Sequence, residues 1–274
     1  MVRLKSDSLV YDQTTWQPFT AEIQLGADSI NVNVIHAEIH GIATSGEMAI
    51  KKSHGNLTLK LKTDARNQPL EPVINRLFKE GEKITGHFDL DGVLKAQCPF
   101  DVIPTSLTGN FELVARDGII FRAMVLSNIL TFLNTTEILF GKNPGIGKEG
   151  LAYKTIKLKA TLDKGRLNLT EAVMDGASME LICQGYIDLI DKKLDLTVLV
   201  APLKTVDRII KFTPLVNYIL AGSLVSIPLK VTGDYAHPEI SILPVSAVGR
   251  GLLGILERTF KLPLKIIEPI LPKN

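Results

Sequence analysis

Cysteine is scarce in this sequence of 274 residues, with only Cys98 and Cys183 present. The two cysteines lie far apart in the chain and form no CxxC pair, so the sequence contains no thiol-based metal or redox motif. They could form one disulfide in an oxidising compartment, but we favour two separate buried thiols.

An excess of charge of either sign is also missing. The 31 basic and 29 acidic residues give a formal net charge of +2, and the charges are spread along the chain. Aromatic residues make up 6% of the sequence, and no cluster combines them with basic side chains. We expect no nucleic-acid partner, because nucleic-acid binding needs a basic surface that neutralises phosphates.

No apolar run is long enough to predict a membrane-spanning helix. The longest uncharged stretch, residues 212–229, is interrupted by Pro214, Gly222 and Pro228, whereas a spanning helix needs about 20 mostly apolar residues. The first six residues contain no apolar core of a signal peptide, and strand-like sequence begins at Leu9. We expect the chain to be a segment of a longer polypeptide.

Motifs for catalysis and cofactor binding are missing as well. The sequence has no GxSxG elbow, and the glycine-rich segment 141–150 lacks the spacing and the Ser or Thr of a phosphate-binding loop. His87, Asp89 and Asp91 share one face of a predicted strand and would suit a metal ion, but a solvated outer face is the simpler interpretation. We predict no catalytic residue, no metal site and no cofactor.

What the sequence does contain is a regular alternation of apolar and polar residues. Leu57, Leu59 and Leu61, for example, alternate with polar residues, which predicts strands with one apolar face and one solvated face. Turn signals separate such stretches, among them Asp91-Gly92, Asp117-Gly118 and Asp163-Lys164-Gly165. These hairpin connections predict a mainly β protein with a long antiparallel meander sheet.

Glycine recurs at one place in these strands, in the pattern apolar-x-Gly-x-apolar-x-apolar. Gly86, Gly109 and Gly185 occupy this position, and Gly233 does so more loosely. Each glycine has the same parity as the apolar residues around it, so it leaves space on the apolar face or permits a bend or bulge. We therefore expect the sheet to be strongly curved.

Four segments break the alternation and predict helices, at about residues 69–79, 123–140, 203–220 and 245–262. We assign residues 1–244 to one curved β-sheet domain with the first three helices inserted, and residues 245–274 to a C-terminal amphipathic helix and tail. The apolar stripe and the cations of this last segment predict contact with a membrane surface, through Leu252, Leu253, Leu256, Phe260, Arg250, Arg258, Lys261 and Lys265. Packing of the helix on the sheet is the other interpretation, and the two are compatible.

The order of several phrases resembles the C-terminal region of the AsmA-like family, which includes AsmA, TamB and YhdP. The phrases are Ile84–Gly92, Leu107–Leu113 followed by Arg116–Ile120, Gly185–Leu189 with Leu194–Leu196, and Ile227–Gly233. The resemblance covers about residues 20 to 262.

This resemblance implies a function and a location. It implies a periplasmic protein of the Gram-negative envelope, attached to the inner membrane through a segment outside this chain, with envelope protein partners. It also implies that the curved sheet forms an apolar groove that moves phospholipids, or other acyl-chain lipids, between the inner and outer membranes and supports outer-membrane integrity. A non-catalytic structural or assembly protein with a packed β core is the alternative.

The alternation then assigns the positions that would contact lipid in such a groove. They are the apolar residues of one strand parity, namely Leu57, Leu59, Leu61, Ile84, Phe88, Leu90, Leu107, Phe111, Leu113, Ile156, Leu158, Ile187, Leu189, Leu194, Leu196, Val198, Ile227, Leu229 and Val231. Acyl chains follow a continuous apolar path because each methylene kept from water contributes about 0.8 kcal/mol.

Overall fold

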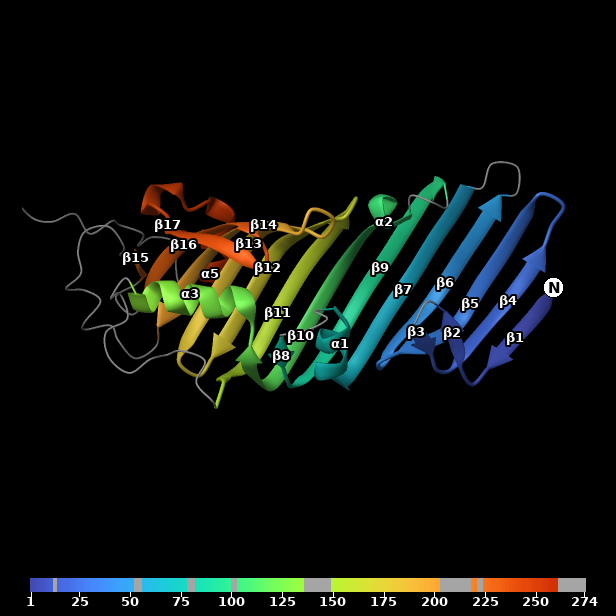
Figure 1. Cartoon of the computed structure of the whole chain (residues 1–274), viewed down its shortest axis with the longest axis horizontal. Helices are drawn as coiled ribbons and strands as arrows, with labels where there is room; N and C mark the ends of the chain where they lie inside the picture. Colours follow the sequence, from blue (N-terminus) through green and yellow to red (C-terminus); the bar gives the residue numbers. More distant parts are fainter. Residues whose placement is uncertain are drawn as a thin grey trace, which may run out of the picture.

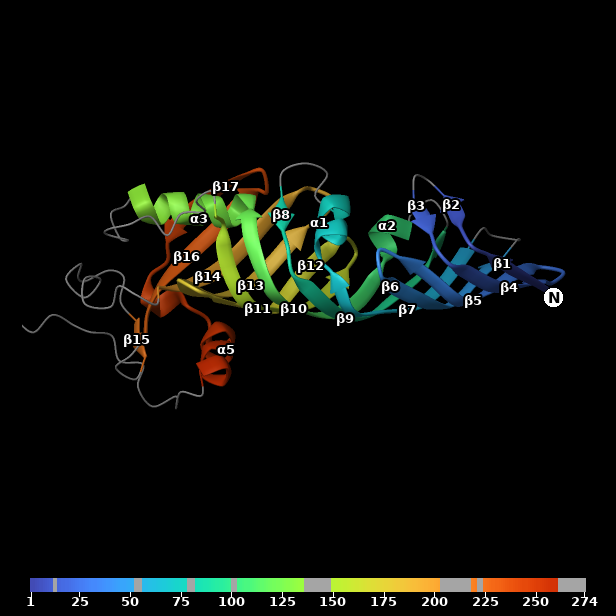
Figure 2. The same ribbon diagram turned by 90° about the horizontal axis from the view of Figure 1, so that it is seen from below.

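The structure is a computed structural model that describes residues 1–11, 14–51, 56–77, 82–99, 103–135, 149–202, 218–220 and 224–260. Strands dominate these residues and build one long, curved, open sheet with helices on both of its faces (Figure 1 and Figure 2). The prediction of a mainly β protein built on a long antiparallel meander sheet is confirmed.

Fifteen strands of the described residues belong to this sheet. They are β1 (Val2–Ser6), β4 (Phe19–Leu25), β5 (Ser29–Ile39), β6 (Ile42–Lys51), β7 (Asn56–Pro69), β8 (Lys83–Ile84), β9 (His87–Pro99), β10 (Thr108–Arg122), β11 (Leu151–Asp163), β12 (Arg166–Gly176), β13 (Met179–Asp188), β14 (Lys193–Pro202), β15 (Tyr218–Leu220), β16 (Leu224–Asp234) and β17 (His237–Ile242). A separate two-stranded sheet pairs β2 (Leu9–Tyr11) with β3 (Thr14–Trp16).

The strands follow one another across the sheet almost in chain order. The order is β1-β4-β5-β6-β7-β9-β10-β11-β12-β13-β14-β16, and neighbouring strands are antiparallel. The short β8 pairs with β10 beyond the start of β9, while β15 and β17 pair with β16 on the side away from β14. Short hairpins join neighbours such as β11 and β12, whereas longer connections contain helices.

Two predicted turns lie inside strands, so those predictions were wrong. Asp91-Gly92 belongs to β9 and Asp117-Gly118 belongs to β10. Gly92 is needed because a Cβ there would lie 2.7 Å from the Phe111 ring, so glycine here answers a packing requirement and not a turn. The turn predicted at Asp163-Lys164-Gly165 does join β11 to β12, where Lys164 and Gly165 have φ of 49° and 82°, as a tight hairpin requires.

Glycines with positive φ accompany irregularities in the strand pairing. Gly46 and Gly185 have φ of 149° and 137°, and the register of the neighbouring strand shifts just beyond their partners Val34 and Leu169. A Cβ on Gly185 would lie 2.8 Å from the Cα of Leu196. Glycine therefore lets the chain form a bulge at these points, and bulges increase the bend and twist of a sheet.

The helices lie on opposite faces of the sheet (Figure 2). α1 (Glu71–Leu77) and α3 (Met124–Thr135) pack on the face that we call the inner face, whereas α5 (Arg250–Phe260) packs on the outer face. The short α2 (Ile103–Ser106) contacts β9, and the 3-10 helix η2 (Val245–Ala247) precedes α5. Proline in the first turn of α1, at Pro72, suits a helix start.

The predicted helix boundaries can be compared only within the described residues. α1 lies within 69–79, α3 within 123–140 and α5 within 245–262. Most of the helix predicted over 203–220 falls outside the described residues, and its last three residues form strand β15. The glycine-rich segment 141–150 also lies almost entirely outside the described residues, as does the tail from residue 261.

The main hydrophobic core lies on the inner face, between α1 and α3 and the C-terminal half of the sheet. Phe88 of β9, Leu133 of α3 and Ile227 of β16 belong to it and are at most 1% exposed. Each side chain of this size contributes about 1.5–3 kcal/mol when it is fully buried. Cys98 and Cys183, in β9 and β13, are free thiols.

Candidate functional site

One row of directly paired residues crosses the inner face from β1 to β17 without a polar side chain. Each member is the register partner of the next, and we call the set the apolar row: Leu4, Ala21, Val34, Gly46, Leu61, Leu94, Gly109, Leu162, Leu167, Ile187, Leu194, Gly233 and Pro238. Neighbouring strands lie about 4.8 Å apart, so the twelve steps of the row span roughly 58 Å.

Further rows flank the apolar row on both sides. One contains only apolar residues, namely Val2, Ile23, Val32, Met48, Leu59 and Ala96. The other has three polar members near its start and comprises Ser6, Phe19, Ala37, Thr44, Thr63, Gly92, Phe111, Ala160, Leu169, Gly185, Leu196, Val231 and Ile240. The inner face is therefore a continuous apolar surface several residues wide.

Helices cover this surface over the C-terminal half of the sheet. Leu130 and Leu133 of α3 are 4% and 0% exposed and belong to the same core cluster as Leu196 and Leu229. Ile74 of α1 joins the cluster from the other helix. The inner face in this half is thus the interior of a packed core.

The N-terminal half of the inner face has less cover. Val32, Met48, Leu59 and Leu61 are only half-buried, and Leu4 at the edge strand is 40% exposed. The β2–β3 hairpin lies on the same side of the sheet as α1 and α3 (Figure 2). Apart from Ala21, which is 1% exposed, the members of the apolar row on β1 to β7 are half-buried or exposed and lie outside the core cluster, so we call this part of the face the open N-terminal half.

The structure places most of the predicted lipid-contact residues on the inner face. Those that join the main core or pack against it are Ile84, Phe88, Leu90, Leu113, Ile156, Leu158, Ile187, Leu194, Leu196, Val198, Ile227, Leu229 and Val231. Leu57 is buried on the same face, and Leu59, Leu61 and Phe111 are half-buried there.

Two of the predicted lipid-contact residues lie off the sheet. Leu189 follows the end of β13 and is 55% exposed in the turn, while Leu107 precedes β10 and is half-buried.

The outer face carries charged side chains that pair across strands. Asp89 accepts a hydrogen bond from the backbone N–H of Asn67 at 2.8 Å and forms an ion pair with Arg116 at 2.7 Å. These two contacts, in that order of size, hold the pKa of Asp89 below its usual value. Asp91 pairs in the same way with Arg66 at 2.7 Å. The carboxylates considered above as metal ligands thus have cationic partners.

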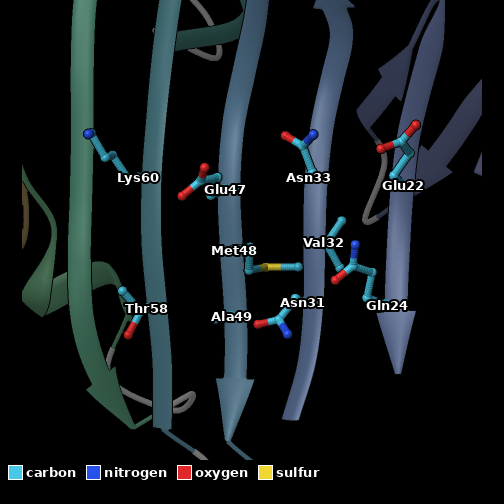
Figure 3. Close-up of a pocket in the computed structure, with 10 residues that line it drawn as sticks. All are labelled: Glu22, Gln24, Asn31, Val32, Asn33, Glu47, Met48, Ala49, Thr58 and Lys60. Atoms are coloured by element: carbon cyan, nitrogen blue, oxygen red, sulfur yellow. The ribbon is translucent and has the colours of Figure 1, made fainter. Parts of the chain in front are cut away.

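A shallow hollow of about 440 Å³ lies on the outer face of the N-terminal half (Figure 3). Residues of four adjacent strands line it. Those with outer-face parity are mostly polar, namely Glu22, Gln24, Asn31, Asn33, Glu47, Thr58 and Lys60 with Ala49, and the inner-face residues Val32 and Met48 also border it. The hollow is therefore a polar surface on the side of the sheet opposite the apolar row.

α5 covers an apolar patch on the outer face. Leu252 and Ile255, each 1% exposed, pack with Ile182 and Leu199, and Leu253 packs against the same cluster. The leucines predicted to contact a membrane surface, Leu252 and Leu253, therefore face the sheet in this structure. At the end of the helix Arg258 forms an ion pair with Glu171 at 3.8 Å.

The other residues predicted to contact a membrane are only partly described. Arg250 is exposed at the start of α5. Leu256 and Phe260 belong to α5, but their side chains lie outside the described part of the structure. Lys261 and Lys265 lie outside the described residues altogether.

The apolar patch beneath α5 was not predicted from the sequence, although the strand sequences carry a sign of it. Val173, Ile182 and Leu199 are register partners on the outer face of β12, β13 and β14. Each has an apolar residue immediately beside it in the chain, which interrupts the alternation. Strands with continuous apolar runs are buried on both faces. This pattern therefore indicates that the outer face of these strands is covered as well as the inner face.

Two features are absent from the part of the chain that the structure describes. No helix there is long and apolar enough to cross a membrane. No group of three or more His, Cys, Asp or Glu side chains in that part of the chain is arranged to hold a metal ion.

Comparison with known proteins gave one match, to a family. The family described as YhdP protein matches residues 4–240. No curated protein and no solved structure matches the chain.

Proposed function

Because this chain belongs to the YhdP family, one of the AsmA/TamB/YhdP-type families of envelope lipid-transport proteins, we propose that it binds phospholipid acyl chains on its inner face and moves phospholipids between the inner and outer membranes. Lipid traffic of this kind would support the integrity of the outer membrane. The proposal involves no catalytic step. It locates the protein in the periplasm, attached to the inner membrane by a segment outside this chain.

The apolar row is the observation that carries this proposal. A bilayer's hydrocarbon core is about 30 Å thick, so one acyl chain reaches about 15 Å. Its stretch from β1 to β7 takes four steps of about 4.8 Å, or roughly 19 Å in all, which is enough for one acyl chain. An acyl chain on such a surface keeps its methylenes from water at every step, at about 0.8 kcal/mol for each.

The open N-terminal half is where we propose that acyl chains bind. Val32, Met48 and Leu61 are half-buried there and lie outside the core cluster, whereas in the C-terminal half Leu196, Leu229 and Val231 are buried in one cluster with α3. A ligand can cover the N-terminal half without displacing a helix. This narrows the proposed contact residues to those of β1 to β7 and the facing part of β9.

A photo-crosslinking amino acid placed at paired positions tests this proposal. Leu61 lies on the inner face of β7, and its neighbour Lys60 lies on the outer face. We expect phospholipid adducts by mass spectrometry when the probe replaces Leu61 and only background when it replaces Lys60. Equal yields at the two positions, together with no phospholipid in an organic extract of the purified protein, would overturn the proposal.

The packed core of the C-terminal half favours a second candidate function, that of a non-catalytic structural or assembly protein of the envelope with protein partners. Its inner-face side chains are buried as in any closed core, for example Ile227 and Leu229 at 0% exposure. This candidate predicts that Leu61→Asp leaves lipid transport unchanged once the variant is shown to fold. The lipid-binding proposal predicts that the same substitution stops transport.

We also propose that residues 245–274 contact a membrane surface. Support comes from Arg250 and Arg258, which are exposed on α5 while Leu252 and Ile255 are buried against the sheet. Co-sedimentation with anionic vesicles measures this contact. The variant Arg250→Glu should bind such vesicles less well than the wild type, and unchanged binding would remove α5 from the proposed contact.

A further inference from the structure

Two threonines interrupt the apolar inner face side by side. Thr44 of β6 and Thr63 of β7 are register partners, and they are 7% and 8% exposed. Along β7 the inner-face neighbours of Thr63 are Leu61 of the apolar row and the buried Ala65. The pair stands where the open N-terminal half of the inner face meets the covered half.

The Thr63 hydroxyl has no hydrogen-bond partner among the described residues, although its oxygen is buried. A buried hydroxyl without a partner destabilises the fold, because the group has lost its hydrogen bonds to water. Most buried polar groups in native proteins are hydrogen-bonded, so an exception calls for an explanation. A ligand that supplies the missing partner is such an explanation.

The residues around this hydroxyl form a small candidate binding site. On the next strand Gly92 faces Thr63, and a Cβ on Gly92 would lie 2.7 Å from both the Thr63 Oγ1 atom and the Phe111 Cδ1 atom. The hydroxyl and the edge of the Phe111 ring therefore share the space above a residue without a side chain. Phe111 is half-buried, so the protein encloses its ring only in part.

We infer that the Thr63 hydroxyl recognises the carbonyl end of an acyl chain, donating a hydrogen bond to its oxygen after the Phe111 ring turns aside. This inference rests on the proposed function, because the chain itself would lie on the apolar row beside Leu61. The carbonyl is the first polar group that an acyl chain carries, and Thr63 is the polar inner-face residue next to Leu61 along β7. Ester carbonyls of glycerolipids and carboxylates of free fatty acids share this chemistry.

Calorimetric titration of the full chain with matched ligands tests the inference. The probes are dioctanoyl phosphatidylglycerol, its dioctyl ether analogue without carbonyls, and octanoate. We expect the wild type to bind the diester about fivefold more tightly than the diether, the preference that one neutral hydrogen bond gives. The titration with octanoate shows whether a free carboxylate competes with the diester for the same site.

Three variants assign the preference to the hydroxyl. Thr63→Val keeps the branched shape and removes the hydroxyl, so it should bind both lipids with the affinity of the diether. Thr63→Ser should retain the preference. Thr58→Val is the matched control on the exposed outer face of the same strand, and it should behave like the wild type.

Thermal unfolding supplies a second readout that is independent of ligand. Thr63→Val should raise the Tm of the lipid-free protein, because it removes a buried hydroxyl without a partner. A lower Tm would overturn the inference, since the hydroxyl would then be stabilised within the protein itself.

The remaining outcomes separate this inference from the proposed function. Equal affinity of the wild type for diester and diether would overturn the inference and leave the proposed function standing. An unchanged preference in folded Thr63→Val would do the same. No binding of either lipid to the wild type would overturn both.

Discussion

Glu82 caps helix α3 at Met124, 42 residues further along the chain. Its two carboxylate oxygens accept the backbone N–H of Met124 at 3.1 and 3.2 Å. This N–H begins the helix and has no acceptor within it, and a carboxylate there is also favoured by the helix dipole. The contact fixes one end of the helix that covers the inner face.

Replacing Glu82 with Ala should therefore loosen α3. Loss of a side-chain cap costs about 1 kcal/mol, and the first turn of the helix should exchange its amide hydrogens faster. Urea unfolding and hydrogen exchange at residues 124–127 measure the two effects. Glu82→Gln keeps one acceptor oxygen and should lose less stability than Glu82→Ala. Equal losses of stability in the two variants would show that the charge of Glu82, and not its hydrogen bond, holds the helix.

Replacing glycine with alanine should destabilise the protein at one position and stabilise it at another, according to the surroundings of each glycine. At Gly185, where φ is 137° and the Leu196 Cα lies 2.8 Å from the site of a Cβ, alanine should destabilise the sheet by more than about 1 kcal/mol. At Gly254 in α5 the nearest atom is a flexible Arg258 nitrogen at 3.5 Å, so alanine should stabilise the helix by about 1 kcal/mol. Unfolding in urea compares the two, and losses of similar size would contradict the bulge at Gly185.

Truncation of a buried side chain of α5, the helix on the outer face, should reduce the stability of the protein even without a membrane. Leu252 is 1% exposed and packs with Ile182 and Leu199, and Leu→Ala at such a site costs about 2–5 kcal/mol. The exposed Arg250 provides the control, because Arg250→Ala should change stability by no more than about 0.5 kcal/mol. A neutral result for Leu252→Ala in vesicle-free buffer would mean that α5 does not hold to the sheet in solution.

Glu180 should make stability depend on pH. Burial, followed by the nearby Asp175, raises the pKa of Glu180 above its usual 4.5, and its Oε2 atom is buried without a partner among the described residues. The folded protein then binds more protons than the unfolded chain once the pH exceeds 4.5, so stability falls as the pH rises from there through the folded pKa. Glu180→Gln should remove this decline.

Urea unfolding at about pH 5 and about pH 7 measures the change in stability. Glu47→Gln, in the polar hollow of the outer face, accounts for the general effect of removing a carboxylate. The lowered pKa of Asp89 acts in more acidic solution, below its usual 3.8, and does not enter this range. A wild-type protein that gains stability between the two pH values relative to Glu180→Gln would contradict the prediction.

The alternation of side chains was enough to predict the fold and the sidedness of the sheet. Leu57, Leu59 and Leu61 lie on the inner face because period-2 spacing matches the pleat. The same rule conceals the outer patch at Ile182 and Leu199, because period-2 spacing assigns the apolar residues of a strand to one face only. Asp91-Gly92 has the composition of a turn, and only the position of the Phe111 ring on the next strand explains why the glycine lies inside β9.

The extent of helical cover could not be predicted from strand sequences. Leu61 and Leu196 have the same local pattern, yet one is half-buried in the open half and the other is 5% exposed beneath the helices. The difference arises from where α1 and α3 pack, which depends on contacts between distant segments such as Glu82 and Met124. Thr63 likewise has an ordinary strand sequence around it, and its unpaired hydroxyl is visible only once the neighbouring strands are in place.

The apolar row has a consequence for the direction of any movement along it. On β1 to β7 its members are aliphatic residues and one glycine, so an acyl chain that advances by one strand within this stretch exchanges one set of apolar contacts for another of similar kind. Such a track offers the same resistance in both directions and contains no ratchet. Net flow along it would have to be set by the chemical potential of lipid at its two ends, as in diffusion down a gradient.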